Sequence, residues 1–347
     1  MRLFRGPIHY GRELPGHPFN ITALLTRLII VAQRKVFCER LKTTRMRYVD
    51  FDATTPDDSQ ELIYAILQRS EPALVARYGT FELETTLRGL SIASPSLPLV
   101  KLTKMICGRC GPFWWDNSIR SGIHWIAGVF PPDNTTMMRF AQLVDTDSGE
   151  IDVLVGGRAE GEQFMREQRF PGGKGIPNDC FIRPDSPVSW TRHLKDKRVL
   201  VVSPFDVSIR AQYERRKELF PNNPSFLPDF ELITYRPVVS FAGEFAALPY
   251  KNWFEALDKM ERDIAEINFD IALISAGAYG MNLGARIKRM GKQAVHVGGI
   301  LQAMFGLKFR GTDEVPYWRQ FYTDAWTRPL TTERPKNYMT VENGSYW

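Results

Sequence analysis

Cysteine is scarce in this chain of 347 residues: only Cys38, Cys107, Cys110 and Cys180 are present. They are too few and too scattered to form a disulfide framework. Cys107 and Cys110 have the spacing of half a zinc site or of a redox pair, but no histidine lies at matching spacing, which favours a structural or accidental pair. The amino terminus also lacks the basic, apolar and small-residue order of a secretory signal. These absences favour a reducing, cytoplasmic setting.

Long apolar runs are missing as well. The longest apolar stretch, residues 21–36, is interrupted by Arg27 and by Gln33, Arg34 and Lys35, so it does not supply the roughly 20 apolar residues that a membrane-spanning helix needs. Its apolar residues recur at three-and-four spacing, and basic residues follow as far as Arg47, which predicts an amphipathic basic helix. Three roles are open for residues 21–47: packing on the domain, attachment to a membrane surface, or contact within an oligomer.

Several common functional motifs are absent. No G-x-G-x-x-G dinucleotide fingerprint, no G-x-x-x-x-G-K-[ST] phosphate loop and no G-x-S-x-G nucleophile turn occurs in the sequence. This argues against nicotinamide dehydrogenases, P-loop NTPases and lipase-type hydrolases. The net charge of +6 is mild, and the basic cluster Arg215-Arg216-Lys217 has no alternating exposed aromatic residues. We therefore expect no nucleic-acid partner.

What is present is a regular alternation of strand and helix signals. The composition, 44% apolar and 24% charged, is that of a globular protein. Apolar runs predict strands at residues 73–76, 199–202, 269–274 and 294–297, and helices with apolar faces separate them, the first capped by Asp57, Asp58 and Ser59. Continuous apolar strands alternating with helices predict a Rossmann-like α/β fold with a mostly parallel sheet covered on both faces. We expect an extension over residues 1–54 and one domain over residues 55–347. The less regular residues 105–195 are expected to build binding surface or lids.

The predicted strands end in small, flexible or hydrogen-bond-donating residues. In a parallel sheet these ends meet at one edge, where ligands bind, and the helices that follow offer amide groups and positive dipole ends to phosphate. An anionic nucleotide is the expected ligand, although glycines at such turns also serve only to permit tight geometry. The candidate binding residues are Arg77, Tyr78, Gly79, Thr80, Ser203, Gly277, Ala278, Tyr279, His296, Gly298, Gly299 and Gln302.

The chain also resembles a known family. Arg77-Tyr78-Gly79-Thr80-Phe81-Glu82 is similar to the R-[FY]-G-D-G-E turn of the GT-D-type glycosyltransferases. Residues 269–280 (FDIALISAGAYG) and 291–306 (GKQAVHVGGILQAMFG), together with the carboxyl-terminal tail, resemble a branch of that family associated with polysaccharide assembly. The likeness extends from about residue 55 to the carboxyl terminus.

The resemblance implies a transferase that moves a sugar from a nucleoside diphosphate donor, often a UDP-sugar, to a hydroxyl group of a glycan acceptor. In the family, the acidic pair of the turn helps to hold the diphosphate and a divalent metal such as Mn²⁺ or Mg²⁺. Here Thr80 replaces the aspartate and Glu82 alone is retained as a metal ligand. Arg77 and His296 are the candidates for balancing charge on the diphosphate, and Gln302 and Tyr279 for orienting the donor.

Three residues are candidates for the base that deprotonates the acceptor: Glu82, Asp206 and His124. The aromatic residues Trp318, Trp326, Tyr346 and Trp347 either form an acceptor platform or only close the fold. Two other functions stay open. One is a non-catalytic homologue that binds nucleotide-sugars or acts as a scaffold. The other is a cell-envelope transferase that moves a pyruvyl or phosphate-bearing group.

Overall fold

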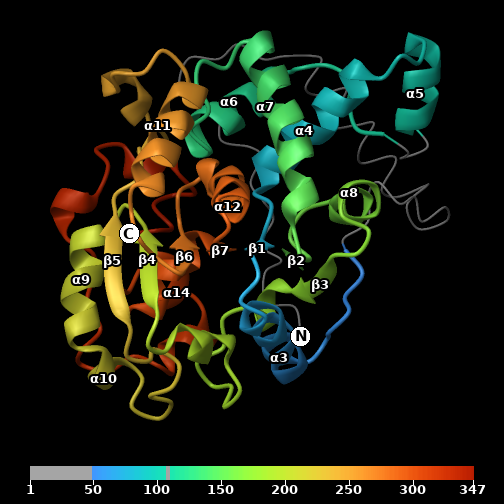
Figure 1. The fold of residues 1–347 in the computed structure, drawn as a ribbon. Coiled ribbons are helices and arrows are strands. Elements are labelled where there is room, and N and C mark those ends of the chain that lie inside the picture. The colour runs from blue at the N-terminus through green and yellow to red at the C-terminus, as the bar shows by residue number, and fades with distance from the viewer. Residues whose placement is uncertain (1–48, 107–109) are drawn as a thin grey trace.

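A single sheet of seven strands forms the centre of the molecule (Figure 1). The computed structural model describes residues 49–106 and 110–347. The strand order is β3-β2-β1-β7-β6-β4-β5, and all pairings are parallel. The strands are β1 (Ala73–Ala76), β2 (Val153–Gly156), β3 (Lys174–Pro177), β4 (Arg198–Val202), β5 (Glu231–Tyr235), β6 (Ile271–Ile274) and β7 (Gln293–His296). The α/β class and the parallel sheet are thus confirmed.

The inner strands are buried on both faces, which explains their unbroken apolar sequences. In β1, Leu74 and Ala76 belong to one hydrophobic core, whereas Ala73 and Val75 belong to a second core on the opposite face. This alternation follows from the two-residue period of a strand. The sheet therefore needs a helical layer on each side.

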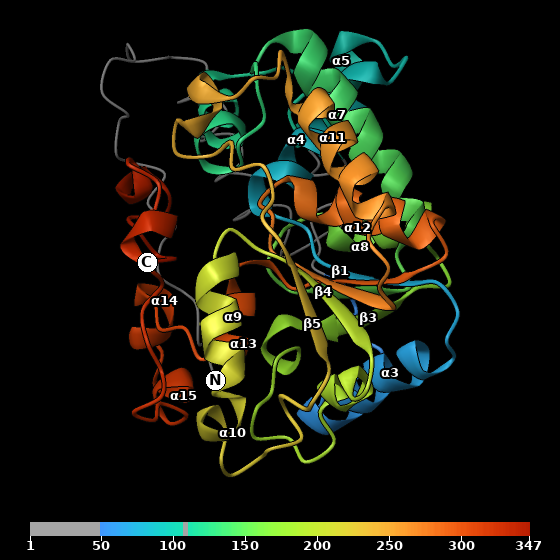
Figure 2. The same cartoon turned by 60° about the vertical axis from the view of Figure 1, so that its left-hand side comes forward.

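The two layers are clearly separated in Figure 2. One layer contains α4 (Thr80–Ala93), α7 (Asn134–Asp147), α8 (Glu162–Arg169), α11 (Trp253–Ala265) and α12 (Tyr279–Arg289). The opposite layer contains α3 (Pro56–Gln68), η6 (Trp190–Leu194), α9 (Asp206–Glu214), α10 (Arg216–Leu219) and α13 (Leu301–Met304). The peripheral helices are α5 (Pro98–Ile106), α6 (Asn117–Ser121), α14 (Arg310–Asp313) and α15 (Pro316–Arg319). The single-turn elements are η3 (Gly122–Ile126), η4 (Ser148–Glu150), η5 (Asn178–Cys180), η7 (Glu244–Ala247), η8 (Gly298–Ile300), η9 (Thr331–Glu333) and η10 (Tyr338–Thr340).

Local sequence signals mark the ends of two helices. The first helix differs slightly: Thr55, not an acidic residue, is the N-cap of α3 and accepts a hydrogen bond from the Asp58 amide. Pro56 occupies the first helical position, where its missing amide hydrogen costs nothing. Gly291 follows α12 with a φ of 82°, as expected for a residue that ends a helix.

The stretch between residues 105 and 195 is more regular than its composition suggests. It contains α6, α7 and α8 and the short strands β2 and β3. β2 has the same length as β1, β6 and β7 and ends in glycine, and it was not among the strands predicted from the sequence.

Both ends of the described chain fold back on the domain. Residues 49–54 pack beside β2 and β3, with Val49 buried and the Asp52 amide bonded to the Gly175 carbonyl. The expected amphipathic segment, residues 21–47, lies outside the described residues. No helix among residues 49–106 and 110–347 is long and apolar enough to cross a membrane.

Candidate functional site

The centre of the sheet contains a topological switch point between β1 and β7. These neighbouring strands are parallel, but the chain leaves β1 into α4 on one face and leaves β7 into η8 and α13 on the other. Connections that diverge to opposite faces leave a crevice outside the carboxyl ends of the two strands. In open α/β sheets this crevice is where ligands bind.

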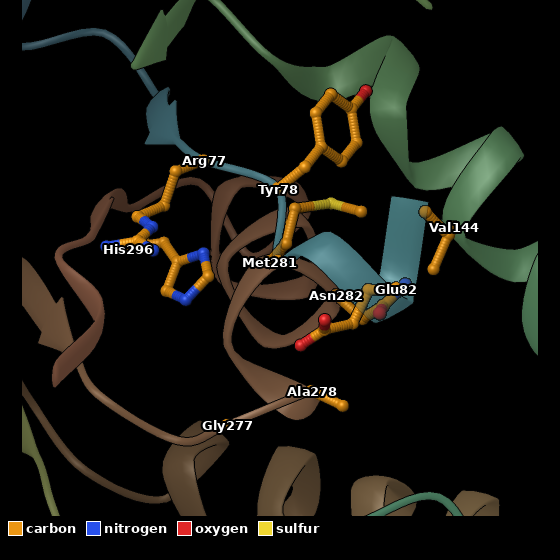
Figure 3. Close-up of a pocket in the computed structure, with 10 residues that line it drawn as sticks. Arg77, Tyr78, Glu82, Val144, Gly277, Ala278, Met281, Asn282 and His296 are labelled. Atoms are coloured by element: carbon orange, nitrogen blue, oxygen red, sulfur yellow. The ribbon is translucent and has the colours of Figure 1, made fainter. Parts of the chain in front are cut away.

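A small hollow lies at this crevice. It is lined by Arg77, Tyr78, Gly79 and Glu82 after β1, by Gly277, Ala278, Met281 and Asn282 after β6, by His296 at the end of β7, and by Val144 of α7. In Figure 3 the Glu82 carboxylate and the His296 imidazole lie on opposite sides of the hollow, and the Tyr78 ring points away from it. Seven residues predicted from separate strand ends therefore converge here: Arg77, Tyr78, Gly79, Glu82, Gly277, Ala278 and His296.

Glycines make room for the polar side chains of the site. A Cβ atom at Gly79 would overlap the Glu82 carboxylate, and one at Gly280 would overlap the His296 ring. Gly298 has a φ of 72°, and a Cβ there would lie 3.1 Å from Arg77 Nη1. These close approaches give the strand-end glycines a steric role in placing Glu82, His296 and Arg77, in addition to permitting tight turns.

Arg77 lines the hollow, and Arg158 lies close enough to lower the pKa of Arg77. Burial and the nearby positive charge of Arg158 lower the pKa of Arg77 to about 10, so Arg77 stays protonated at neutral pH. Within residues 49–106 and 110–347, no carboxylate lies within 4.0 Å of either guanidinium. Glu82 and Glu342 act on Arg77 from a greater distance. The crevice therefore carries positive charge without a direct ion-pair partner.

Arg158 comes from the loop between β2 and α8, a position that the sequence did not single out. The Glu162 carboxylate accepts hydrogen bonds from the amides of Gly157, Arg158 and Ala159, and so fixes the loop that carries this exposed arginine. Because β2 lies beside β1 and parallel to it, Arg158 and Arg77 both follow strand ends at the same edge of the sheet. The short strand before Gly157 was the only signal that could have revealed it.

Burial shifts the pKa of both titratable groups that flank the hollow. Burial raises the pKa of the Glu82 carboxyl, while a hydrogen bond from its own amide and the charge of Arg77 oppose the rise. Burial, with a smaller contribution from Arg77, lowers the pKa of His296 to about 3. His296 is consequently a neutral imidazole at pH 7, and its Nδ1 atom has no hydrogen-bond partner.

Asn282 contributes a second unpaired polar atom to the hollow. Its amide nitrogen donates to Asp147, but its buried Oδ1 atom has no partner. Buried polar atoms are rarely left unpaired, so unpaired atoms lining a cavity indicate a place for water or a ligand. Asn282 lies on α12 four residues beyond Ala278, and no sequence motif pointed to it.

Two of the helix N-termini at this edge are occupied by carboxylates of the chain itself. Glu162 binds the amides that precede α8. Glu333, buried near the C-terminus, accepts hydrogen bonds from the amides of Val207 and Ser208 and from the Ser208 hydroxyl at the start of α9. In contrast, no side chain caps α12, whose first residues border the hollow. The anion site that the sequence suggested after Ser203 is thus filled from within.

Several other predicted binding residues have partners outside the hollow. The Tyr78 hydroxyl donates to Ser148 Oγ, and the Tyr279 ring stacks on Trp253 at 4.7 Å. Thr80 is exposed as the first residue of α4. Ser203 is buried and accepts a hydrogen bond from the Phe205 amide.

The remaining predicted residues are also spread around the site. Gln302 is buried on α13, and neither atom of its side-chain amide has a partner. Gly299 lies under the ring of Tyr346. Of the three candidate bases, only Glu82 lines the hollow. Asp206 pairs with Arg210 in the first turn of α9, and His124 bonds the Val129 carbonyl and packs on Phe245.

The C-terminal segment, residues 331–347, covers this edge of the molecule. Tyr346 packs on Gly299, and the Trp347 ring contacts Phe205 and Phe241. Burial, Glu342 and Arg77 all affect the Tyr346 hydroxyl, and its pKa is raised because burial outweighs the charge of Arg77. The segment therefore lies next to Arg77.

Comparison with known proteins found no matching family model, no matching curated protein and no matching solved structure.

Proposed function

We propose that the chain is a glycosyltransferase that uses a nucleoside diphosphate sugar, probed first as a UDP-sugar, and transfers the sugar to a hydroxyl group of a glycan. One observation carries the proposal: Arg77, a carboxylate and a neutral imidazole meet at the switch point of a parallel sheet, with the charge of Arg158 nearby. This combination suits an anionic donor bound by the arginine and the hydroxyl of a separate acceptor bound beside the carboxylate.

The diphosphate is assigned to Arg77 and Arg158. Guanidinium groups bind phosphate oxygens through paired N–H donors, and hydrogen bonds to charged groups contribute about 1.5 to 3 kcal/mol each. The uncapped N-terminus of α12 adds about 0.3 to 1 kcal/mol. Arg77 and Arg158 therefore provide most of the recognition of the leaving diphosphate.

A divalent metal, which the family resemblance implies, does not fit the residues of this crevice. Within the part of the chain that the structure describes, no three side chains of the ligating types His, Cys, Asp or Glu gather in one place. Glu82 is the carboxylate of the hollow, and the nearest strong charge acting on it is the cation Arg77. We propose that the guanidinium groups stabilise the leaving group without a metal.

Glu82 is assigned as the base. The acceptor oxygen forms a bond to the anomeric carbon as the bond from that carbon to the donor phosphate breaks. The hydroxyl proton passes to the Glu82 carboxylate, and the bonding electrons leave with the nucleoside diphosphate, whose charge Arg77 balances. A raised carboxyl pKa makes Glu82 a stronger base than an exposed glutamate. Asn282 Oδ1 and His296 Nδ1 are left to accept hydrogen bonds from sugar hydroxyls.

The hollow is smaller than the whole donor. Its free volume is about 10 Å³, which is room for about one water molecule. The C-terminal segment lies where the remaining donor atoms would extend, beside Arg77 and Gly299. We therefore propose that Tyr346 and Glu342 shift when the donor binds.

Calorimetry and a donor screen test the proposal. UDP should bind the full chain equally in EDTA and in Mg²⁺ or Mn²⁺, and one nucleotide-sugar of a screened panel should be consumed. Glu82→Gln should abolish consumption and retain UDP binding. Glu84→Gln is the matched control, because Glu84 lies on the same helix but pairs with Arg88. Failure of every nucleoside diphosphate to bind under all conditions would overturn the proposal.

The same experiment separates the non-catalytic alternative. The replacement of the family aspartate by Thr80, exposed at the start of α4, is the feature that favours it. Tight UDP binding with no consumption of any donor, with or without acceptors, would support a binding module instead.

A further inference from the structure

A second surface stands out far from the crevice, at the tip of α5. Leu97, Leu99 and Val100 are 72%, 77% and 43% exposed, and they form half of the six large exposed hydrophobic side chains among the described residues. The other three, Val207, Leu330 and Met339, are scattered in sequence. Figures 1 and 2 show α5 at the outer end of the helical layer, away from the sheet. Exposed apolar side chains gathered in this way mark an interaction surface.

The charges of the chain segment that carries this tip have one sign. Between Glu84 and Asp116 the sequence contains no Asp or Glu, whereas α5 itself carries Lys101 and Lys104. Lys101 donates to the Ile92 carbonyl, and Lys104 donates to Ser96 Oγ, so both ammonium groups are held close to the aliphatic tip. Lysines on a segment without acidic residues favour an anionic partner.

Aromatic side chains border the same surface. The Lys101 ammonium lies 5.9 Å from the centre of the Phe113 ring, and Phe113 meets Trp114 edge to face at 5.0 Å. Both rings are partly exposed. Exposed aliphatic residues flanked by lysine and by aromatic rings match the depth profile of a bilayer, in which apolar chains lie deepest and aromatic and basic groups lie at the headgroups.

We propose that the α5 tip (Leu97, Leu99 and Val100, with Lys101 and Lys104) docks on an anionic lipid bilayer. The aliphatic side chains enter the interface and the lysines bind lipid phosphates. A second copy of the chain fits less well, because a symmetric contact would place the basic groups of one tip against those of the other. The proposal is independent of the transferase reaction, since none of these residues lines the crevice.

Vesicle flotation tests the proposal with the full chain. The vesicles contain phosphatidylcholine alone or with added phosphatidylglycerol. We expect wild-type protein to float with the anionic vesicles and not with the neutral ones. The variant Leu97→Ser/Leu99→Ser/Val100→Ser should bind roughly tenfold less, because its interfacial apolar area is lost. The control Val207→Ser/Leu330→Ser/Met339→Ser removes the other three exposed aliphatic side chains and should bind like wild type.

Hydrogen exchange on the wild-type chain gives a local readout that does not depend on a variant folding. Peptides covering residues 94–106 should gain protection with anionic vesicles and show no change with neutral ones. Equal flotation of wild type and the tip variant, or unchanged exchange over residues 94–106, would overturn the proposal. Loss of a dimer in the tip variant without any difference in vesicle binding would also overturn it, and would assign the surface to a contact between copies.

Discussion

The His296 ring lies directly against the Cα atom of Gly280, so that a Cβ atom at that position would overlap the ring. The contact joins the end of β7 to the first turn of α12 and holds the imidazole at the border of the hollow. Gly280 is thus needed for the shape of the site, although it makes no polar contact through a side chain.

Gly280→Ala is the first prediction. The overlap should displace His296, lower the free energy of unfolding by about 1 to 3 kcal/mol and weaken UDP binding. Denaturant unfolding and calorimetry measure the two effects. Adding His296→Ala should restore stability by removing the clash but should not restore UDP affinity. Gly172→Ala, with no atom near the added Cβ, is the control. Full UDP affinity in Gly280→Ala would contradict the placement of the donor.

Arg158→Ala is the second prediction. Loss of one charge-assisted contact of about 1.5 to 3 kcal/mol should weaken UDP binding by roughly 10- to 100-fold. Stability should be unchanged because the side chain is exposed. The control Arg319→Ala removes the same charge from an exposed position on α15. If both variants bind UDP alike, net charge and not a specific contact explains the affinity.

The shifted pKa values of His296 and Glu82 predict opposite effects of acidification on stability. The pKa of His296 falls to about 3 on folding, so the unfolded chain binds more protons and stability is lost as the pH drops from about 6.5 toward 3. The pKa of Glu82 rises on folding, so its contribution to stability improves as the pH drops through that raised pKa.

Urea unfolding between pH 7 and pH 4.5 measures both effects. Relative to wild type, His296→Gln should lose less stability on acidification, by on the order of 1 to 3 kcal/mol, and Glu82→Gln should lose more. If the free energy of unfolding depends on pH in the same way for wild type and both variants, folding shifts the pKa of neither His296 nor Glu82.

Glu333→Gln tests how the C-terminal segment is attached. Glu333 Oε1 accepts from the amides of Val207 and Ser208 at the start of α9, and Oε2 accepts from the buried Ser208 hydroxyl. Glutamine keeps one acceptor oxygen, but it loses the charge and places an NH2 donor against that hydroxyl. We expect a loss of about 1 to 3 kcal/mol in the free energy of unfolding. The exposed Glu314, paired only with Arg310, provides the control substitution Glu314→Gln. An equal effect of the two substitutions would rule out a capping role for Glu333.

Part of this arrangement could be predicted from the sequence for a simple physical reason. Buried parallel strands are continuous apolar runs, and their carboxyl ends must meet at one edge, so Arg77, Glu82, Gly277 and His296 could be grouped without a structure. What could not be predicted depends on long-range contacts. The α9 terminus after Ser203 is filled by Glu333, some 130 residues away, and no local pattern announces that pairing.

Tyr279 and Arg158 are two further residues whose positions could not be predicted from the sequence. Tyr279 follows a glycine turn like a ligand-binding residue, yet its ring stacks on Trp253 of α11. Arg158 follows β2, which is as short as β1 and β7 but was not predicted, so its strand end was not considered. The direction of a side chain such as that of Tyr279 is set by tertiary packing, which the sequence pattern does not encode locally.

A crystal structure of the full chain with UDP will show whether the crevice between β1 and β7 holds a nucleoside diphosphate. We expect phosphate density within hydrogen-bond distance of the Arg77 guanidinium, at the hollow bordered by Gly277 and His296. Phosphate density at another edge of the sheet, with this hollow closed around its present side chains, would contradict it.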